Sequence, residues 1–474
     1  MKFHIIINAT VLCSLFSVAT AQAQNQVLTL AEARAKALEQ NKEIKKANLT
    51  VEQTGYDVKT YKSNYFPRVS LVAIDAYSSS QGDFTIQGGN LPIYTWNPST
   101  GQYVPNVMPQ EDGTYKMTQY AMFPDKTIEY KIKNIFNAGI QLKQPLYMGG
   151  KITAAYNMAK LGHQMAKDNI RLTESEVLVR TDEAYSQAVR AKELAQVAQS
   201  YKALLTELQK NVESAVKHGM KTRNDQLKVQ VKLNEAELSI QKAENAYRLA
   251  RMNLSQIMGY DQLNYDYDVV SPDSLSIEPN TLVQDVLNAP NINSRPEVTL
   301  LQSKTTLSSE QVKLAKSEFM PNLALLGGAS YTNGIEVAGR KLIDKISGYV
   351  GVTLNIPILT FGERGSKIRS AKARHQLAEM EEQDLHEKMQ LELMQCQNNY
   401  NEAQTELQLC QHSLEQAKEN MRLTRKQYDV GLEPLSELLD AQALWQSCSA
   451  NLVEARCQLQ LAETKLLKAA GQLK

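Results

Sequence analysis

Apolar residues recur at alternating spacings of three and four along two neighbouring stretches of the C-terminal half of the chain. The stretch before Gly431 places them at Cys396, Tyr400, Ala403, Leu407, Cys410, Leu414, Ala417, Met421, Thr424 and Tyr428, and the stretch after it at Leu438, Ala441, Trp445, Cys448, Leu452, Ala455, Leu459, Ala462, Leu466 and Ala469. This heptad spacing is typical of coiled coils. Two such seams on either side of one glycine predict an antiparallel helical hairpin that turns at Gly431.

The N-terminal half predicts a second hairpin, which turns at Gly219 and has a seam of Ala184, Ala188, Ala191, Ala195 and Ala198. The outgoing helices are expected at residues 151–218 and 363–430, and at about 1.5 Å per residue each is roughly 100 Å long. The return arms are shorter, so we expect the helices at 28–65 and 296–318 to stack end to end on them. A capping box, Thr29-x-x-Glu32, starts the first of these helices, and Pro296 starts the second.

The hairpins belong to a tandem repeat that covers the mature chain. Pro145 precedes Gly219 by the same number of residues as Pro357 precedes Gly431. Each copy reads as helix, strand, strand, long helix, turn and helix. We place the first copy at residues 24–258, a linker at 259–295 and the second copy at 296–474. Repeats of this size bury their apolar faces against one another.

Four short segments show the period-two pattern of strands, at residues 69–77, 136–142, 323–331 and 349–356. One apolar and one polar face over this length fits a strand between lipid and water, although a half-buried strand of a soluble sheet has the same period. Four strands are too few to close a barrel, and two chains would give eight strands, a barrel filled by its own side chains. A water-filled conduit therefore needs at least a trimer. A long segment, 79–128, joins the first strand pair and a short one, 333–345, joins the second, as in outer-membrane barrels.

Composition and targeting signals narrow the class of protein. The chain has 474 residues and a net charge of +1, which argues against a nucleic-acid partner. Residues 1–23 combine an N-terminal lysine, an apolar stretch and small-x-small cleavage patterns, so we interpret them as a secretory signal peptide that includes Cys13. No later stretch reaches about 18 consecutive apolar residues, so we expect no transmembrane helix.

The four cysteines of the mature chain are Cys396, Cys410, Cys448 and Cys457. An exported protein often pairs its cysteines. Folding the hairpin about Gly431, however, places Cys410 opposite Leu452 and Cys448 opposite Leu414. We therefore predict that all four thiols are free and act as small buried apolar groups.

The second tip and its return helix carry the most specific motif, TRKQYDVGLEPLSELLDAQALWQSCSANLVEARCQLQLAETKLLKAAG. With it, nearly the whole mature chain resembles the TolC-like outer-membrane efflux proteins of Gram-negative bacteria. The resemblance implies an α+β membrane protein and a homotrimer. Its twelve-strand β-barrel would sit in outer-membrane lipid, and its twelve-helix α-barrel would form a tunnel through the periplasm. It also implies a passive duct with two partners, a periplasmic adaptor (membrane fusion) protein and an inner-membrane transporter of RND, ABC or MFS type.

The resemblance assigns roles to residues at the two tips. Glu437 and Asp440 match the acidic rings of the pore constriction, and Tyr428 and Asp225 match a gate pair. Glu433 departs from the family pattern, which has a basic residue there, and Arg223 or Lys221 is a candidate for the missing cation. Gly219, Met220, Val430, Gly431 and Leu432 match the tips that dock the adaptor. Simpler interpretations exist, because glycines often end helices and acidic residues favour a helix N-terminus.

Sequence motifs for other chemistry are absent. The chain contains no P-loop, GxGxxG, HExxH or CxxC motif, and its six histidines are scattered. We therefore expect no enzyme activity, no cofactor and no metal site. The alternative to a duct is a structural coiled-coil protein of the periplasm or cell surface, with no pore.

Overall fold

The computed structural model describes residues 26–260, 266–270 and 281–473. The predicted signal peptide, its cleavage site and Cys13 lie outside these residues, as do parts of the predicted linker. The chain divides into two compact units. The first comprises Met1–Gly55, Leu161–Leu307 and Gln376–Lys474 and is helical, and the second comprises Tyr56–Lys160 and Ser308–His375 and contains the main β-sheet.

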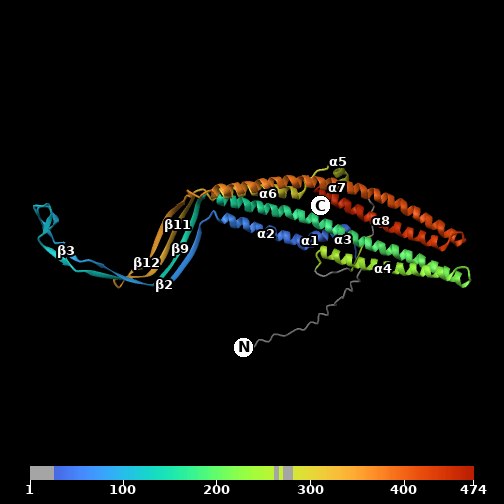
Figure 1. The fold of residues 1–474 in the computed structure, drawn as a ribbon, viewed down its shortest axis with the longest axis horizontal. Coiled ribbons are helices and arrows are strands. Elements are labelled where there is room, and N and C mark those ends of the chain that lie inside the picture. The colour runs from blue at the N-terminus through green and yellow to red at the C-terminus, as the bar shows by residue number, and fades with distance from the viewer. Residues whose placement is uncertain (1–25, 261–265, 271–280, 474) are drawn as a thin grey trace, which may run out of the picture. The chain divides into compact units, whose positions relative to one another are not determined.

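The predicted repeat is confirmed by matching element lengths. The long helices α3 (Lys151–Lys217) and α7 (Glu363–Asp429) have 67 residues each. Their return arms, α4 (Arg223–Ile257) and α8 (Leu435–Ala469), have 35 each. Helices α2 (Lys42–Ser63) and α6 (Pro296–Ser317) have 22 each. Figure 1 shows the two hairpins, α3 with α4 and α7 with α8.

The heptad seams form the hairpin interfaces, as predicted. The alanine seam of α3 is buried, with Ala188 fully inaccessible to solvent and Ala195 the most exposed at 8%. In the second hairpin, Cys410 packs against a cluster that contains Leu452, Ala455 and Leu459, which agrees with the predicted register. All four described cysteines are free, as predicted, but only Cys457 is buried, and the other three are half-buried.

The helix predicted at 28–65 is wrong as a single element, because it breaks at Asn41 into α1 (Leu30–Gln40) and α2. The Asn41 side chain accepts a hydrogen bond from the backbone N–H of Glu43 and donates one to the carbonyl of Ile257, at the end of α4. It thus caps α2 and joins it to α4. Arg295 and the carbonyl of Ala469 make the corresponding junction between α6 and α8. The capping box of Thr29 and Glu32 and the helix start at Pro296 are confirmed.

The main sheet has four antiparallel strands in the order β12-β11-β9-β2. These are β2 (Arg68–Ile86), β9 (Lys126–Met148), β11 (Asn322–Val337) and β12 (Arg340–Asn355). With 16 to 23 residues, they are longer than the segments that alternate in the sequence. Among the described elements, β2 pairs only with β9 and β12 only with β11, so both edges of the sheet are open.

The strand register separates an apolar from a polar face. One row across the four strands consists of Val69, Leu142, Gly327 and Val350, and the next row, on the opposite face, consists of Ser70, Gln141, Gly328 and Tyr349. On the apolar face Val69 is 66% exposed and Val350 is 82% exposed in the single chain. In the described part of the chain, no helix is both long enough and apolar enough to cross a membrane.

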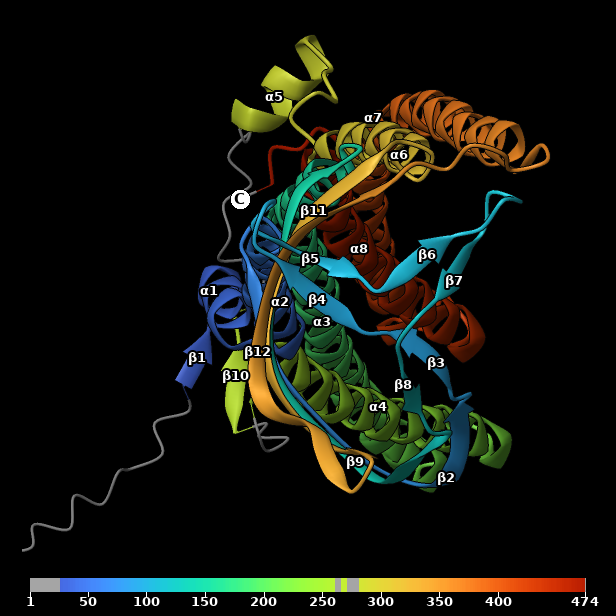
Figure 2. The same cartoon turned by 90° about the vertical axis from the view of Figure 1, so that its left-hand side faces the viewer.

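The segment 79–128 is a folded appendage rather than a loop. Strands β2 and β9 extend into it, and six short strands follow: β3 (Gly89–Pro92), β4 (Tyr94–Asn97), β5 (Gln102–Pro105), β6 (Val107–Pro109), β7 (Tyr115–Met117) and β8 (Tyr120–Phe123). β3 pairs with β8, β4 with β5 and β6 with β7 (Figure 2). Asn106 lies at the branch, where its N–H donates to the carbonyl of Ile93 and its carbonyl accepts from the N–H of Thr118. Its side chain also bonds Thr95 and Gln119.

A small buried core joins the segment around Leu28 to the long helix α3. Strand β1 (Gln26–Leu28) pairs in parallel with β10 (Tyr267–Val269), and helix α5 (Thr281–Asn288) packs beside α8. The Tyr185 hydroxyl donates to the carbonyl of Leu28. Nearby, the fully buried carboxylate of Asp182 accepts from Arg34 on α1 and from Thr464 on α8. These polar contacts hold α1, α3 and α8 together.

Candidate gate and docking surface at the hairpin tips

Both long helices end in the same hydrogen-bonded turn. Gly219 donates to the carbonyl of Val216 and Met220 to that of Ala215, and Gly431 and Leu432 make the equivalent bonds beyond α7. This is the Schellman arrangement, which needs a left-handed residue after the helix. Gly219 and Gly431 supply it, with φ of +74° and +78°. Helix termination alone therefore explains the two glycines.

The turns also present an apolar surface. Met220 and Val430 are each 71% exposed and Leu432 is 77% exposed. A Cβ atom built on either glycine would meet nothing within 4 Å. The space beside both turns is therefore open in the single chain, and a larger side chain there would project outward rather than into the hairpin.

The two hairpins pack against each other near their tips. Leu205 and Val212 of α3, Val229 of α4 and Leu438 of α8 form a buried cluster, with Tyr428 partly buried against it. Burial raises the pKa of the Tyr428 phenol, and the carboxylates of Asp225 and Asp429 raise it further. The ring of Tyr428 thus packs against this buried cluster and lies close to Asp225 of the other hairpin.

Asp225 also has a local role. It is the third residue of α4, and its carboxylate accepts from the backbone N–H and the hydroxyl of Thr222, while its own N–H donates to Thr222 Oγ1. These hydrogen bonds from Thr222 are the main cause of the lowered pKa of Asp225. The pattern Thr222-x-x-Asp225 is itself a sequence signal for this capping box.

The structure distinguishes between the two candidate cations. The ammonium of Lys221 lies 4.7 Å from the centroid of the Tyr428 ring. Arg223 instead donates to Gln226 of its own helix at 2.9 Å. Glu433 is half-buried, and its backbone N–H points to the carbonyl of Gln427. Lys221, rather than Arg223, is the cation that contacts the ring of Tyr428.

Glu437 and Asp440 lie in the first turns of α8 and both are exposed, whereas Leu438 and Leu439 between them are buried. The two carboxylates therefore share the outward side of the helix. The pKa of Lys232 on α4 is raised mainly by its hydrogen bond to Glu235 and further by Asp440. Asp440 thus lies in the electrostatic field of the first hairpin.

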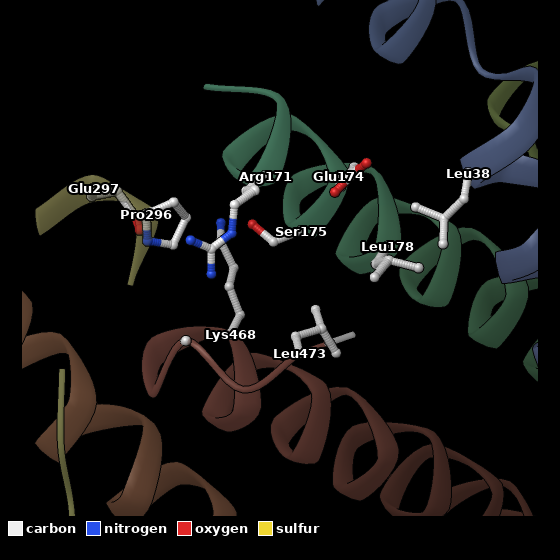
Figure 3. Close-up of a pocket in the computed structure, with 10 residues that line it drawn as sticks. Leu38, Arg171, Glu174, Ser175, Leu178, Pro296, Glu297, Lys468 and Leu473 are labelled. Carbon is white, nitrogen blue, oxygen red and sulfur yellow. The ribbon is translucent and has the colours of Figure 1, made fainter. Parts of the chain in front are cut away.

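A cavity of 360 Å³ lies elsewhere in the helical unit, at the junction of α6 and α8 beside α3. The side chains of Arg171 and Lys468 converge in it, with Glu174 and Glu297 on its walls (Figure 3). None of the predicted tip residues lines this cavity. Among the described residues, no group of three or more His, Cys, Asp or Glu side chains is arranged to hold a metal ion.

Comparison with known proteins identifies a family and several solved structures with this architecture. The chain matches the family described as "Outer membrane efflux protein" over residues 33–260 and 292–472. The outer membrane efflux protein BepC of Brucella suis biovar 1 (strain 1330) is 22% identical over 428 residues, which cover 90% of this chain and 87% of BepC. The Campylobacter jejuni CmeC outer membrane channel superposes with a TM-score of 0.71 at 17% identity, covering 94% of this chain and 85% of CmeC. The outer membrane protein VceC of Vibrio cholerae gives a TM-score of 0.70 at 15% identity, with 93% and 96% covered. These structural similarities concern the fold.

Proposed function

Because this chain belongs to the outer membrane efflux protein family, we propose that it is the outer-membrane channel of a tripartite export system. Three copies form a passive duct that reaches from the outer membrane into the periplasm. A periplasmic adaptor and an inner-membrane pump open it and supply the energy. The chain itself performs no covalent chemistry.

The open edges of the four-stranded sheet are the observation that carries the proposal. Unpaired backbone groups are not tolerated in lipid, so β2 of one copy must pair with β12 of another. The apolar face then meets lipid and the polar face meets water. Three copies give twelve strands, a barrel wide enough to hold water, whereas eight strands are filled by their own side chains.

The tips supply the gate and the mouth of the duct. Glu437 and Asp440 of three copies would form two carboxylate rings that attract cations. Tyr428, Asp225 and Lys221 connect the second hairpin to the first and hold the mouth closed. Glu433 does not take the place of the family's basic residue. Its charge is opposite, so the latch relies on Lys221.

The exposed apolar turns are the docking sites for the adaptor. Met220, Val430 and Leu432 project from the two tips, and Gly219 and Gly431 keep the surface beside them free. Contiguous exposed apolar surface is typical of protein contact sites. The pump is of RND, ABC or MFS type.

Purification of the full-length protein from outer membranes tests the proposal. We expect a trimer that dissociates on heating and that conducts ions in planar lipid bilayers. A soluble periplasmic species that gives no current would contradict the duct and favour the structural coiled-coil protein. Co-purification after cross-linking in cells would then identify the adaptor and the pump.

A further inference from the structure

The polar face of the four-stranded sheet carries cations without carboxylates. Arg68 on β2 lies directly opposite Lys143 on β9, near the ends of these strands that connect to helices α2 and α3. Lys345 on β12 lies on the same face, opposite Thr332 of β11. From the row of Arg68 to the row of Lys345, the described residues of this face include no aspartate or glutamate.

Nothing within the described chain neutralises these charges. Like charges directly opposite each other destabilise a strand pair. The guanidinium of Arg68 bonds the side-chain oxygen of Asn64 rather than a carboxylate. Among the described residues, Arg68, Lys143 and Lys345 form no ion pair, and all three are exposed. The arrangement has an electrostatic cost within the single chain, so it favours a ligand of opposite charge.

Apolar side chains surround the cations on the same face. The next row on this face, two residues further along the strands, contains Gly328 and Tyr349. The ring of Tyr349 lies across Gly328, and a Cβ atom added to Gly328 would be 3.0 Å from that ring. Val72 and Ile74 of β2 follow on this face, and Ile74 is 54% exposed. The row of Lys345 lies about 20 Å further along the strands. The face therefore offers cations at two levels with an aromatic and aliphatic surface between them.

We propose that this face forms a cationic belt inside the channel, and that the belt binds organic anions with an apolar body. The inference rests on the proposed function, because only a closed barrel turns the polar face into the wall of a pore. In that pore, three copies of the Arg68 and Lys143 pair would surround one axis. Charges around a confined water-filled pore raise the local concentration of oppositely charged solutes. The carboxylate or sulfonate of the cargo would contact the belt, and its apolar part would contact Tyr349 and Ile74.

The cationic belt and the acidic mouth attract solutes of opposite charge. Glu437 and Asp440 attract cations at the periplasmic end, whereas Arg68 and Lys143 attract anions within the barrel. An anionic cargo that the pump has driven past the mouth is therefore favoured once it reaches the barrel. This assigns a substrate class to the channel, amphipathic organic anions.

Current block by an aromatic polyanion tests the belt. Pyrene-1,3,6,8-tetrasulfonate is added from the barrel side to the purified trimer in a planar bilayer. We expect the wild-type channel to be blocked, and Arg68→Gln with Lys143→Gln to need a roughly tenfold higher concentration, the loss expected for charge-assisted contacts. The double variant should also become more cation-selective. The matched control is Arg340→Gln with Lys341→Gln, which removes two cations at the turn between β11 and β12 and should leave the block unchanged.

The outcomes separate the belt from the channel itself. Absence of current from the wild-type trimer would contradict the proposed function. Current with identical block in the wild type and the Arg68 and Lys143 variant would overturn the belt and leave the channel intact. Equal loss of block in the control would mean that overall charge acts, and would overturn it too. A neutral polyethylene glycol of similar size should enter all three channels equally, which excludes a change in pore width.

Discussion

The ammonium of Lys221 lies 4.7 Å from the centroid of the Tyr428 ring. The contact joins the connection between α3 and α4 to the last turn of α7, so it links two hairpins that are far apart in sequence. A cation over an exposed or half-exposed ring contributes about 0.5–1 kcal/mol. In the proposed gate, this energy is enough to change the population of an open state, and Lys221 would act in place of a basic residue at position 433.

We predict that Lys221→Gln opens the resting channel about two- to fivefold more often, the change that 0.5–1 kcal/mol implies. Lys221→Arg should retain closure. Tyr428→Phe should also stay closed, since the ring persists, whereas Tyr428→Leu should open. Single-channel recordings give the open probability. If Tyr428→Phe opened the channel as fully as Tyr428→Leu, the hydroxyl and not the ring would hold the gate.

At the tip, we predict that Gly431→Trp abolishes export while the trimer still assembles. The left-handed backbone adds a cost of about 1 kcal/mol, and the bulky ring covers the docking surface. The matched control is Gly113→Trp in the appendage, which also has positive φ and open space around it. Export of a pump substrate from whole cells is the measurement. Normal export by Gly431→Trp would remove this turn from the docking surface.

For the mouth, we predict that Glu437→Gln with Asp440→Asn weakens cation selectivity and block by multivalent cations from the periplasmic side. If the two carboxylates only favour the start of α8, their removal costs about 0.3–1 kcal/mol of helix stability each and leaves the current unchanged. Reversal potentials in a salt gradient distinguish the two. Unchanged selectivity in the double variant would mean that these side chains do not line the pore.

The buried carboxylate of Asp182 predicts a large effect on stability. Its side chain is fully buried and bonded to Arg34 and Thr464. Removing one partner of such a pair typically costs 3–5 kcal/mol, so Asp182→Ala should sharply lower the temperature at which the trimer dissociates. Glu419→Ala removes a carboxylate that pairs with Arg422 on the exposed surface, where water screens the pair, so it should leave this temperature nearly unchanged. Similar melting of the two variants would contradict the stabilising role of the buried pair.

Cys457 predicts a pattern of thiol reactivity and of pH dependence. Burial raises the pKa of its thiol to about 11, so roughly one molecule in a thousand carries the thiolate at pH 8. Iodoacetamide should therefore label Cys457 only after unfolding. As pH rises from about 8.5 to 11, the unfolded chain loses this proton before the folded chain does, so the thiol's contribution to stability falls in that window.

Mass spectrometry of the non-reduced protein should find four free thiols, and a bridge between Cys410 and Cys448 would contradict the hairpin register.

The regular parts of the fold could be predicted because their signals are local. Heptad seams and the glycines at 219 and 431 determine the hairpins, and alternation identifies the middle of each strand. The break at Asn41 could not be predicted, because its partner Ile257 lies in another helix. The outer part of β2 is mostly polar on both faces, so its period-two signal is weak. The outer part of β9 does alternate, with Ile128, Tyr130 and Ile132 between charged residues, but a register shift opposite Tyr77 and Ser80 separates it from the predicted segment. Segment 79–128 has turn-rich composition, and nothing local reveals that Asn106 organises its branches.

The tip residues were identified by resemblance and by helix-end chemistry, and their contacts were not. Lys221 and Tyr428 are brought together by packing between hairpins, which no short-range pattern records. Asp225 carried two signals at once, a capping box with Thr222 and a gate position. In the structure the capping box with Thr222 is complete, and the Asp225 carboxylate still lies close enough to Tyr428 to raise the pKa of the phenol.

The equal lengths of the paired elements have a consequence for symmetry. With 67 residues in each of α3 and α7 and 35 in each of α4 and α8, the long helices of a threefold assembly of this chain would have nearly sixfold symmetry. The side chains at the mouth break that equivalence, since Lys221 and Glu433 occupy corresponding positions of the two repeats, as do Lys228 and Asp440. At these two positions, positive and negative charges would therefore alternate around the mouth, whereas Asp225 and Glu437, which also correspond, are both acidic.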